Sequence, residues 1–287
     1  MTSPAPIREL ELKLAHGRVA ARAWGNPVLP PLLALHGWLD NAGSFDRLAP
    51  LLADRMHIVA IDLPGHGRSD WRAPGVNYHF IDYPFDVVAV ADRLGWERFS
   101  LLGHSLGGAV ASVFAAACPQ RADKLLLIEA LGPLSRSAEE TLTQLQRAMT
   151  DWQRAANRRL RVFADPSGAI TARMQANNLS REAATALIER GIKPVDGGYS
   201  WSSDPRLTQA SALRLSEAQV LNVLAGIDSP TLLLAADTSV DHVDPLLFEQ
   251  RIRAVSGIEV VTLPGGHHLH LEDPQRVAAA MERFLSS

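Results

Sequence analysis

Short apolar segments alternate with helical patterns over the first 130 residues and again after about residue 215, and this alternation restricts the fold more than any other feature of the sequence. It is typical of a mostly parallel sheet that is covered by helices. The apolar segments are short and are followed by turn residues, as buried parallel strands are. Strands are therefore predicted at residues 32–35, 58–61, 101–102, 125–128, 231–234 and 259–263.

The remaining segments of the alternating regions complete this α/β pattern. Residues 7–14 and 18–24 flank the turn His16-Gly17, and together they predict an antiparallel hairpin. The last helical pattern begins with a proline, which is favourable at the first position of a helix. Helices are predicted at residues 44–52, 81–94 and 274–285.

Residues 131–215 interrupt the alternation. Apolar residues recur there at steps of three and four, which is typical of one face of an amphipathic helix. They are Leu142, Leu145, Met149, Trp152, Ala156, Leu160 and Phe163. The pattern predicts one long helix over residues 142–163. We therefore interpret residues 131–215 as a helical insertion in an α/β core made of residues 1–130 and 216–287.

Composition excludes several classes of protein. The chain has 287 residues, of which 47% are hydrophobic, and its formal net charge of −3 provides no chain-wide attraction for nucleic acid. Cys118 is the single cysteine, which excludes an internal disulfide and a cysteine-rich zinc site. No apolar run reaches the roughly 18 residues of a membrane span, and no signal peptide is recognisable. We expect a cytoplasmic protein without nucleic-acid or integral-membrane association.

One motif indicates a nucleophile. Residues 103–107 read GHSLG, which matches G-x-S-x-G, and they lie between a predicted strand and a helix rich in small residues. Glycines allow the tight strand-to-helix turn that projects the serine hydroxyl away from the sheet. The start of the helix offers unpaired N–H groups to a developing oxyanion. Ser105 is therefore the predicted nucleophile.

A serine hydroxyl needs a nearby base, and His267 has the most suitable position among the ten histidines. It follows the predicted strand 259–263 and the turn Pro264-Gly265-Gly266, so it lies at the carboxyl end of a strand, where open α/β sheets place their sites. His268 and His270 are its rivals, and we interpret both as surface or supporting residues.

Other residues are predicted to surround these two. His36 and His104 also stand at strand ends, where a structural role competes with a place in the substrate pocket. Trp152 and Trp201 belong to the insertion, and either packing within it or contact with substrate would account for them.

An oxyanion hole needs two donors. The backbone N–H of Leu106, which follows the nucleophile, is the first, and the backbone N–H of Trp38, in the loop after strand 32–35, is the second.

Taken together, these motifs resemble the α/β-hydrolase superfamily. Besides GHSLGG at 103–108, residues 62–69 read DLPGHGRS and residues 266–267 read GH. Residues 35–46 read LHGWLDNAGSFD, which is similar to the serine hydrolase-like proteins. The resemblance implies an eight-stranded, mostly parallel sheet flanked by helices, a helical cap over residues 131–215, and a Ser-His-acid triad. Residues 62–69 are interpreted as a supporting loop.

The acid departs from the commonest pattern of the superfamily. Many relatives carry it a few residues beyond the strand that is here 231–234, where this sequence has serine, although Asp237 and Asp241 are near. Glu129 ends the strand 125–128, and one subgroup of haloalkane dehalogenases resembles this arrangement. A buried carboxylate needs a partner, which an imidazolium provides. Glu129 is preferred, and Asp237 and Asp241 stay open.

These observations favour a serine hydrolase that acts on a carboxylic ester or a related small acyl substrate through an acyl-enzyme, without a cofactor or metal. Two alternatives stay open. One is a hydrolase of carbon–carbon bonds with the same triad, and the other is a receptor that retains the triad but only binds a small ligand.

Overall fold

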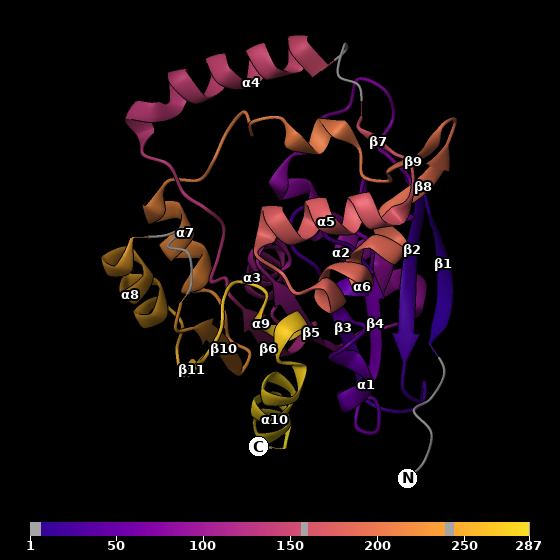
Figure 1. Cartoon of the computed structure of the whole chain (residues 1–287). Coiled ribbons are helices and arrows are strands. Elements are labelled where there is room, and N and C mark those ends of the chain that lie inside the picture. Colours follow the sequence, from indigo (N-terminus) through magenta and orange to yellow (C-terminus); the bar gives the residue numbers. More distant parts are fainter. Residues whose placement is uncertain (1–6, 156–159, 239–243, 287) are drawn as a thin grey trace.

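The centre of the fold is a mixed sheet (Figure 1). A computed structural model describes residues 7–155, 160–238 and 244–286. Within these residues eight strands join in one sheet. In spatial order they are β1 (Arg8–Leu14), β2 (Gly17–Trp24), β4 (His57–Ile61), β3 (Pro31–Leu35), β5 (Phe99–His104), β6 (Ala122–Ile128), β10 (Thr231–Ala236) and β11 (Glu259–Leu263).

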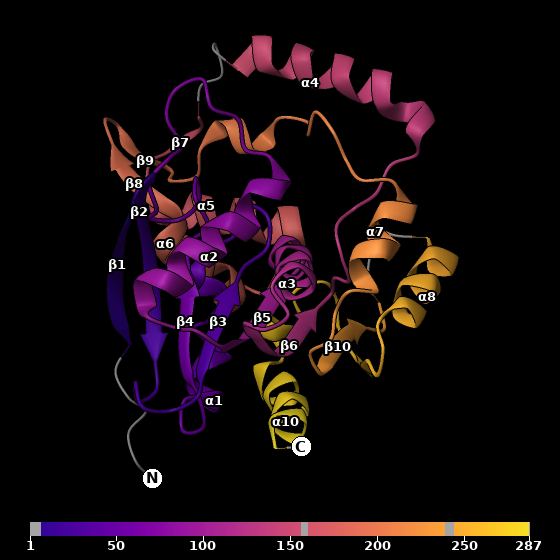
Figure 2. The ribbon, with the colours of Figure 1, turned by 180° about the vertical axis from the view of Figure 1, so that it is seen from behind.

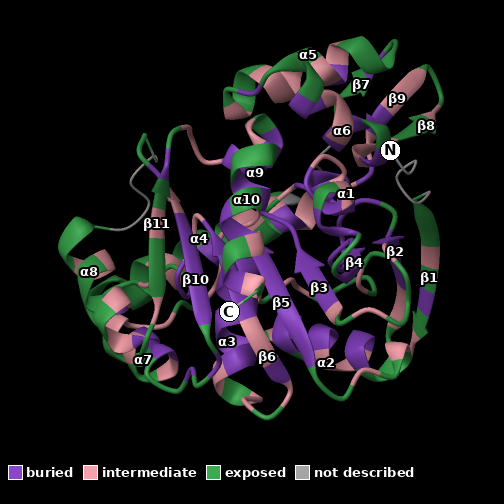
Figure 3. Cartoon of the chain, turned by 90° about the horizontal axis from the view of Figure 1, so that it is seen from below, coloured by how far each residue is buried: buried purple, intermediate pink, exposed green. Residues whose placement is uncertain are grey.

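Strand direction agrees with the sequence-based prediction. The hairpin β1–β2 is antiparallel and β2 runs antiparallel to β4, whereas every pair from β4 to β11 is parallel. Figure 3 shows the central strands buried and the two edge strands, β1 and β11, partly exposed. The predicted eight-stranded, mostly parallel sheet flanked by helices is thus confirmed.

Helices cover both faces of the sheet, because side chains alternate between the faces along each strand. Leu33 and Leu35 of β3 pack with α2 (Tyr83–Leu94), α3 (Leu106–Ala117) and α7 (Glu217–Leu224), which Figure 2 shows on one side. Their neighbours Leu32 and Ala34 pack on the other side. That second layer comprises α1 (Ala49–Leu52), α9 (Leu269–Glu272) and α10 (Pro274–Leu285), while α8 (Pro245–Ala254) packs beside α7 in the first layer.

Two predicted helices differ in detail from the structure. Residues 44–52 form a 3₁₀ turn, η1 (Ala42–Phe45), and then α1, because the Asn41 side chain caps the first turn and Pro50 begins the next. A second 3₁₀ turn, η2 (Phe80–Asp82), precedes α2. The predicted C-terminal helix has the observed bounds of α10.

The insertion is only partly helical. Its helices are η3 (Ala138–Glu140), α4 (Thr141–Ala155), α5 (Pro166–Asn177), α6 (Arg181–Gly191) and η4 (Pro205–Thr208). A small antiparallel sheet joins β7 (Val162–Phe163), β9 (Gly198–Trp201) and β8 (Ile192–Val195). The prediction that one helix reaches Phe163 is wrong, because Phe163 pairs with Tyr199 as a strand and Asp165 caps the next helix. Residues 156–159 lie outside the described residues.

Helix α4 lies along the outer edge of the molecule in Figures 1 and 2. Its apolar side chains are largely exposed, with Leu142 at 66%, Met149 at 65% and Trp152 at 53%. Over the described parts of the chain, no helix combines the length and the apolar character that crossing a membrane requires.

Candidate active site

Ser105 occupies a strained turn between β5 and α3. Its backbone has φ 50° and ψ −115°, a left-handed conformation that costs a non-glycine residue about 1–3 kcal/mol. Its N–H donates to the carbonyl of Ile128 at 3.0 Å, which fixes the turn against β6. A side chain at Gly107 would meet the Leu35 carbonyl oxygen at 2.0 Å, and one at Gly103 would lie 2.5 Å from Gly107. The glycines of the motif are therefore required by close packing.

Glu129 and His267 lie side by side although 138 positions separate them in the sequence. Glu129 follows β6 with a left-handed φ of 56°, and its Oε1 accepts a hydrogen bond from the N–H of Ala236 at 2.6 Å. Its Oε2 lies 3.4 Å from Nδ1 of His267. The carboxylate is 3% exposed and the imidazole 20%. A proton on Nδ1 directed at Glu129 leaves Nε2 as the basic nitrogen, which is the tautomer that a general base needs.

The two other acidic candidates have different surroundings. Asp237 is exposed, and its Oδ1 accepts the N–H of Gly265 at 3.0 Å, so it supports the loop that leads to His267. Asp241 lies outside the described residues. The carboxylate of Glu129 faces the ring of His267.

The predicted oxyanion donors lie on two neighbouring strand ends. Leu106 is the first residue of α3, where a backbone N–H has no intrahelical acceptor. Trp38 follows β3 and is 53% exposed, and its indole N–H donates to the Leu207 carbonyl at 2.9 Å. This bond connects the loop after β3 with η4 of the insertion. The next residue, Leu39, has φ 60°.

His36 and His104 are inside the protein rather than at its surface. His36 is completely buried, with Nδ1 donating to the Gly37 carbonyl at 2.7 Å and Nε2 accepting from Leu63 N–H at 3.0 Å. Burial lowers the pKa of His36 to about 4, so the ring is neutral. His104 is 1% exposed and its Nε2 contacts the His267 carbonyl at 2.8 Å. Both rings thus lie in the interior, and their place in the substrate pocket stays a prediction.

The two tryptophans of the insertion lie in different places. Trp152 lines a cavity of about 420 Å³ between α4 and the segments around Tyr78 and Arg206. Trp201 packs edge-on against Phe163, with ring centroids 5.2 Å apart, and borders a cavity of about 20 Å³. Of these two cavities, the one that Trp152 lines is large enough for a small organic group.

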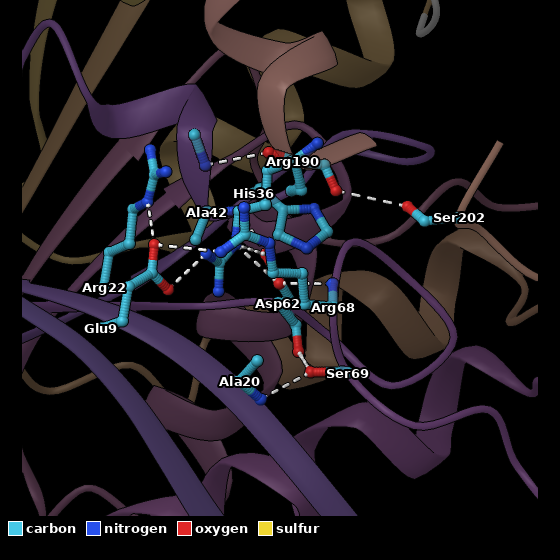
Figure 4. Close-up of polar contacts among 12 residues, drawn as sticks. Glu9, Ala20, Arg22, His36, Ala42, Asp62, Arg68, Ser69, Arg190 and Ser202 are labelled. Carbon is cyan, nitrogen blue, oxygen red and sulfur yellow. Dashed lines mark hydrogen bonds and ion pairs between the residues drawn. The ribbon is translucent and has the colours of Figure 1, made fainter. Parts of the chain in front are cut away.

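A buried ionic network beside the site was not foreseen from the sequence (Figure 4). Arg190 of α6 contacts Asp62 at 2.8 Å and Glu9 at 2.5 Å, and both Arg190 and Asp62 are fully buried. Burial raises the pKa of Asp62, although Arg190 and the N–H groups of Ala42 and Arg68 oppose that shift. The DLPGHGRS motif marks Asp62, but no local pattern identifies Arg190 as its partner.

Comparisons with known proteins agree with this fold. A family model described as alpha/beta hydrolase fold matches residues 30–274. Serine hydrolase-like protein 2 of Homo sapiens is 34% identical over 99% of this chain and 95% of its own length. The crystal structure of a hypothetical protein from Pseudomonas aeruginosa PAO1 is 43% identical, with a TM-score of 0.92 over 97% of this chain and 99% of the other. The thioesterase domain from the curacin biosynthetic pathway is 27% identical, with a TM-score of 0.88 over 99% and 100%.

Proposed function

The chain belongs to the alpha/beta hydrolase fold family, and from this premise we propose that it is a cofactor-independent serine hydrolase that cleaves carboxylic esters or thioesters. The observation that carries the proposal is the 3.4 Å approach of His267 Nδ1 to the buried Glu129 carboxylate, at the same sheet edge as the strained turn of Ser105. A nucleophile, a base and an orienting acid are the groups that acyl transfer requires.

In the proposed mechanism, His267 Nε2 removes the hydroxyl proton of Ser105 as its oxygen attacks the acyl carbon. Glu129 stabilises the imidazolium that forms. The N–H groups of Leu106 and Trp38 bind the oxyanion, and the imidazolium then protonates the leaving alcohol or thiol. Water, activated by the same imidazole, attacks the acyl-enzyme, and collapse of that second intermediate returns Ser105 and releases the acid.

The substrate is proposed to enter beneath the insertion. The cavity beside α4 has a volume of about 420 Å³, and Leu145, Met149 and Trp152 give it an apolar wall. Arg206 and Gln209 also line the cavity. They lie on either side of Leu207 in the sequence, and the Leu207 carbonyl accepts the indole N–H of Trp38. A small acyl group fits such a space. The likeness to a thioesterase domain supports testing thioesters together with oxygen esters.

Active-site labelling and turnover test this proposal. The wild-type protein should react with a fluorophosphonate and hydrolyse members of a series of p-nitrophenyl esters and acyl thioesters. Ser105→Ala should take no label and lose about 10³-fold or more in kcat/KM. Ser112→Ala is the matched control, because Ser112 lies in the same helix with its hydroxyl bonded to Gly108 O at 2.8 Å. Folded wild-type protein that neither labels nor hydrolyses would refute the proposal and favour a receptor.

A further inference from the structure

A buried cluster of charged and aromatic polar groups surrounds Asp40, in the loop between β3 and η1. Asp40 Oδ2 lies 3.4 Å from His268 Nε2 and 3.7 Å from His104 Nδ1. Its other oxygen, Oδ1, accepts a hydrogen bond from Arg173 of α5. The side chain of Asp40 is 1% exposed, that of His104 1% and that of Arg173 12%. The cluster thus joins the insertion to the core without contact with solvent at the carboxylate.

His104 connects this cluster to the proposed base. Its Nε2 lies 2.8 Å from the backbone carbonyl of His267, and a carbonyl only accepts, so Nε2 carries the hydrogen. The opposite nitrogen, Nδ1, therefore has no hydrogen in the neutral ring, and it lies 3.7 Å from Asp40 without a hydrogen bond. His104 also precedes Ser105 directly in the chain. The orientation of this one ring therefore bears on the backbone of the residue that supplies the base.

Arg173 is the counter-ion of the buried Asp40 carboxylate. Burial alone would raise the pKa of Asp40, but the Arg173 guanidinium and the His268 imidazole hold it well below its usual range, so the carboxyl is ionised. A buried carboxylate that loses its counter-ion is strongly destabilised. Arg173 lies on α5, within the insertion, so the ionised state of Asp40 depends on how α5 docks.

Asp40, His104 and His268 also form a donor set that would suit a divalent metal ion, because their ligand atoms lie within 4.8 Å of one another. The ion pair with Arg173 already neutralises the carboxylate, and its guanidinium would repel a second cation. The observations therefore favour a network of protein groups alone, and metal binding becomes an outcome of the test below.

We propose that Arg173, Asp40 and His268 form a positioning relay, which transmits the docking of α5 to the placement of His267. Arg173 fixes Asp40, and Asp40 orients the His268 ring, whose Nε2 lies 3.4 Å from its carboxylate. His268 directly follows His267 in the chain, so its position bears on that of the base. All three are positioning residues that act through His267. The inference rests on the proposed hydrolase function and gives the insertion a role in catalysis beyond forming a cavity wall.

Steady-state kinetics of Arg173→Met, with a p-nitrophenyl ester as substrate, test the relay. Misplacement of a catalytic group by about 1 Å costs on the order of 10²-fold, so kcat should fall about 10- to 100-fold with little change in KM. Arg173→Lys keeps the charge and should recover part of that loss. In an Asp40→Asn background, Arg173→Met should lower kcat much less than it does in the wild-type background, because the two residues act as one unit.

Glu182→Gln is the matched control, since Glu182 pairs with Arg47 at 3.2 Å and is another ionic contact between insertion and core that does not involve Asp40. It should leave kcat unchanged. An active wild type with unchanged kcat in Arg173→Met, or equal losses in Arg173→Met and Glu182→Gln, would overturn the relay alone. So would one equivalent of zinc that stays with the purified wild type and is lost in His268→Ala. A wild type without labelling or turnover would instead overturn the proposed function.

Discussion

At the scale of single residues, the chemistry proposed for this protein depends on one buried carboxylate. Glu129 is 3% exposed, holds the N–H of Ala236 and faces the imidazole of His267, whereas Asp237 is exposed and holds Gly265. A carboxylate in a site of low dielectric stabilises an adjacent imidazolium far more than one surrounded by water. The different surroundings of the two acids lead to opposite expectations for their amide variants.

Glu129→Gln should lower kcat about 10²- to 10⁴-fold, because the amide keeps the shape of the side chain but provides no charge for the imidazolium. Asp237→Asn should cost far less. Both effects are measured by ester hydrolysis under saturating substrate, with thermal melts to establish that each variant is folded. If Asp237→Asn loses activity while Glu129→Gln stays active, the acid of the triad is Asp237, in the loop after β10.

Sequence patterns marked Glu129 and Asp237 as candidates, because both follow buried apolar strands. They favoured Glu129 but left Asp237 open, since β6 and β10 are neighbours whose carboxyl ends reach the same edge of the sheet. The difference between the acids arises from backbone geometry, namely the left-handed φ at Glu129. The pairing of Asp40 with Arg173 was not predicted, because the two residues lie 133 positions apart in the sequence.

At the scale of elements, strands were easier to predict than the insertion. The central strands are short, apolar and buried on both faces, and such segments stand out in any sequence. Strands β7, β8 and β9 have two to four residues each, too few for a detectable alternation. Phe163 continued the helical spacing by chance, and its pairing with Tyr199 decides its conformation.

Helix α4 is the element expected to set substrate size. Trp152 projects from it into the wall of the 420 Å³ cavity and is 53% exposed, so its removal should enlarge the cavity at little cost in stability. Trp152→Ala should shift the best p-nitrophenyl ester toward longer acyl chains and change kcat/KM for that ester by about 10-fold or more, since a methylene in a pocket discriminates by roughly 1–3 kcal/mol.

Trp201→Phe provides the control for this prediction. Trp201 borders the smaller cavity, and phenylalanine retains an aromatic contact with Phe163, so the chain-length profile should stay as in the wild type. Identical profiles for wild type and Trp152→Ala, with both proteins folded, would place the acyl group elsewhere.

At the scale of the whole molecule, stability depends on several histidines that fold into the interior without a proton. Burial lowers the pKa of His36 and His104 to about 4 and that of His66 to about 3, and it lowers the pKa of His270 well below its usual value. In the unfolded chain each would titrate near 6.5. Below that pH the unfolded state binds protons that the folded state excludes.

The folded state should therefore lose stability as the pH falls from about 6.5 toward 4. Each excluded proton contributes about 1.4 kcal/mol per pH unit, so four histidines give a slope of up to about 5 kcal/mol per unit. Asp46 has the opposite effect on the slope. Burial raises its pKa to about 6, so as the pH falls the folded state binds a proton there before the unfolded state does. The net difference between the two states is then three protons. The resulting slope would remove a typical free energy of unfolding of about 5–15 kcal/mol within a few pH units.

Urea unfolding at pH 7.5, 6.5, 5.5 and 4.5 measures this slope. His66→Phe replaces a titrating ring by one that takes up no proton, in a position where the ring packs edge-on against His36 with centroids 5.0 Å apart. Whatever the free energy of unfolding of this variant at neutral pH, its slope between pH 6.5 and 4.5 should be smaller by about 1.4 kcal/mol per unit. A wild-type stability that stays constant over this range would mean that the four rings keep protonated or solvated environments, and the neutral interior inferred here would be wrong.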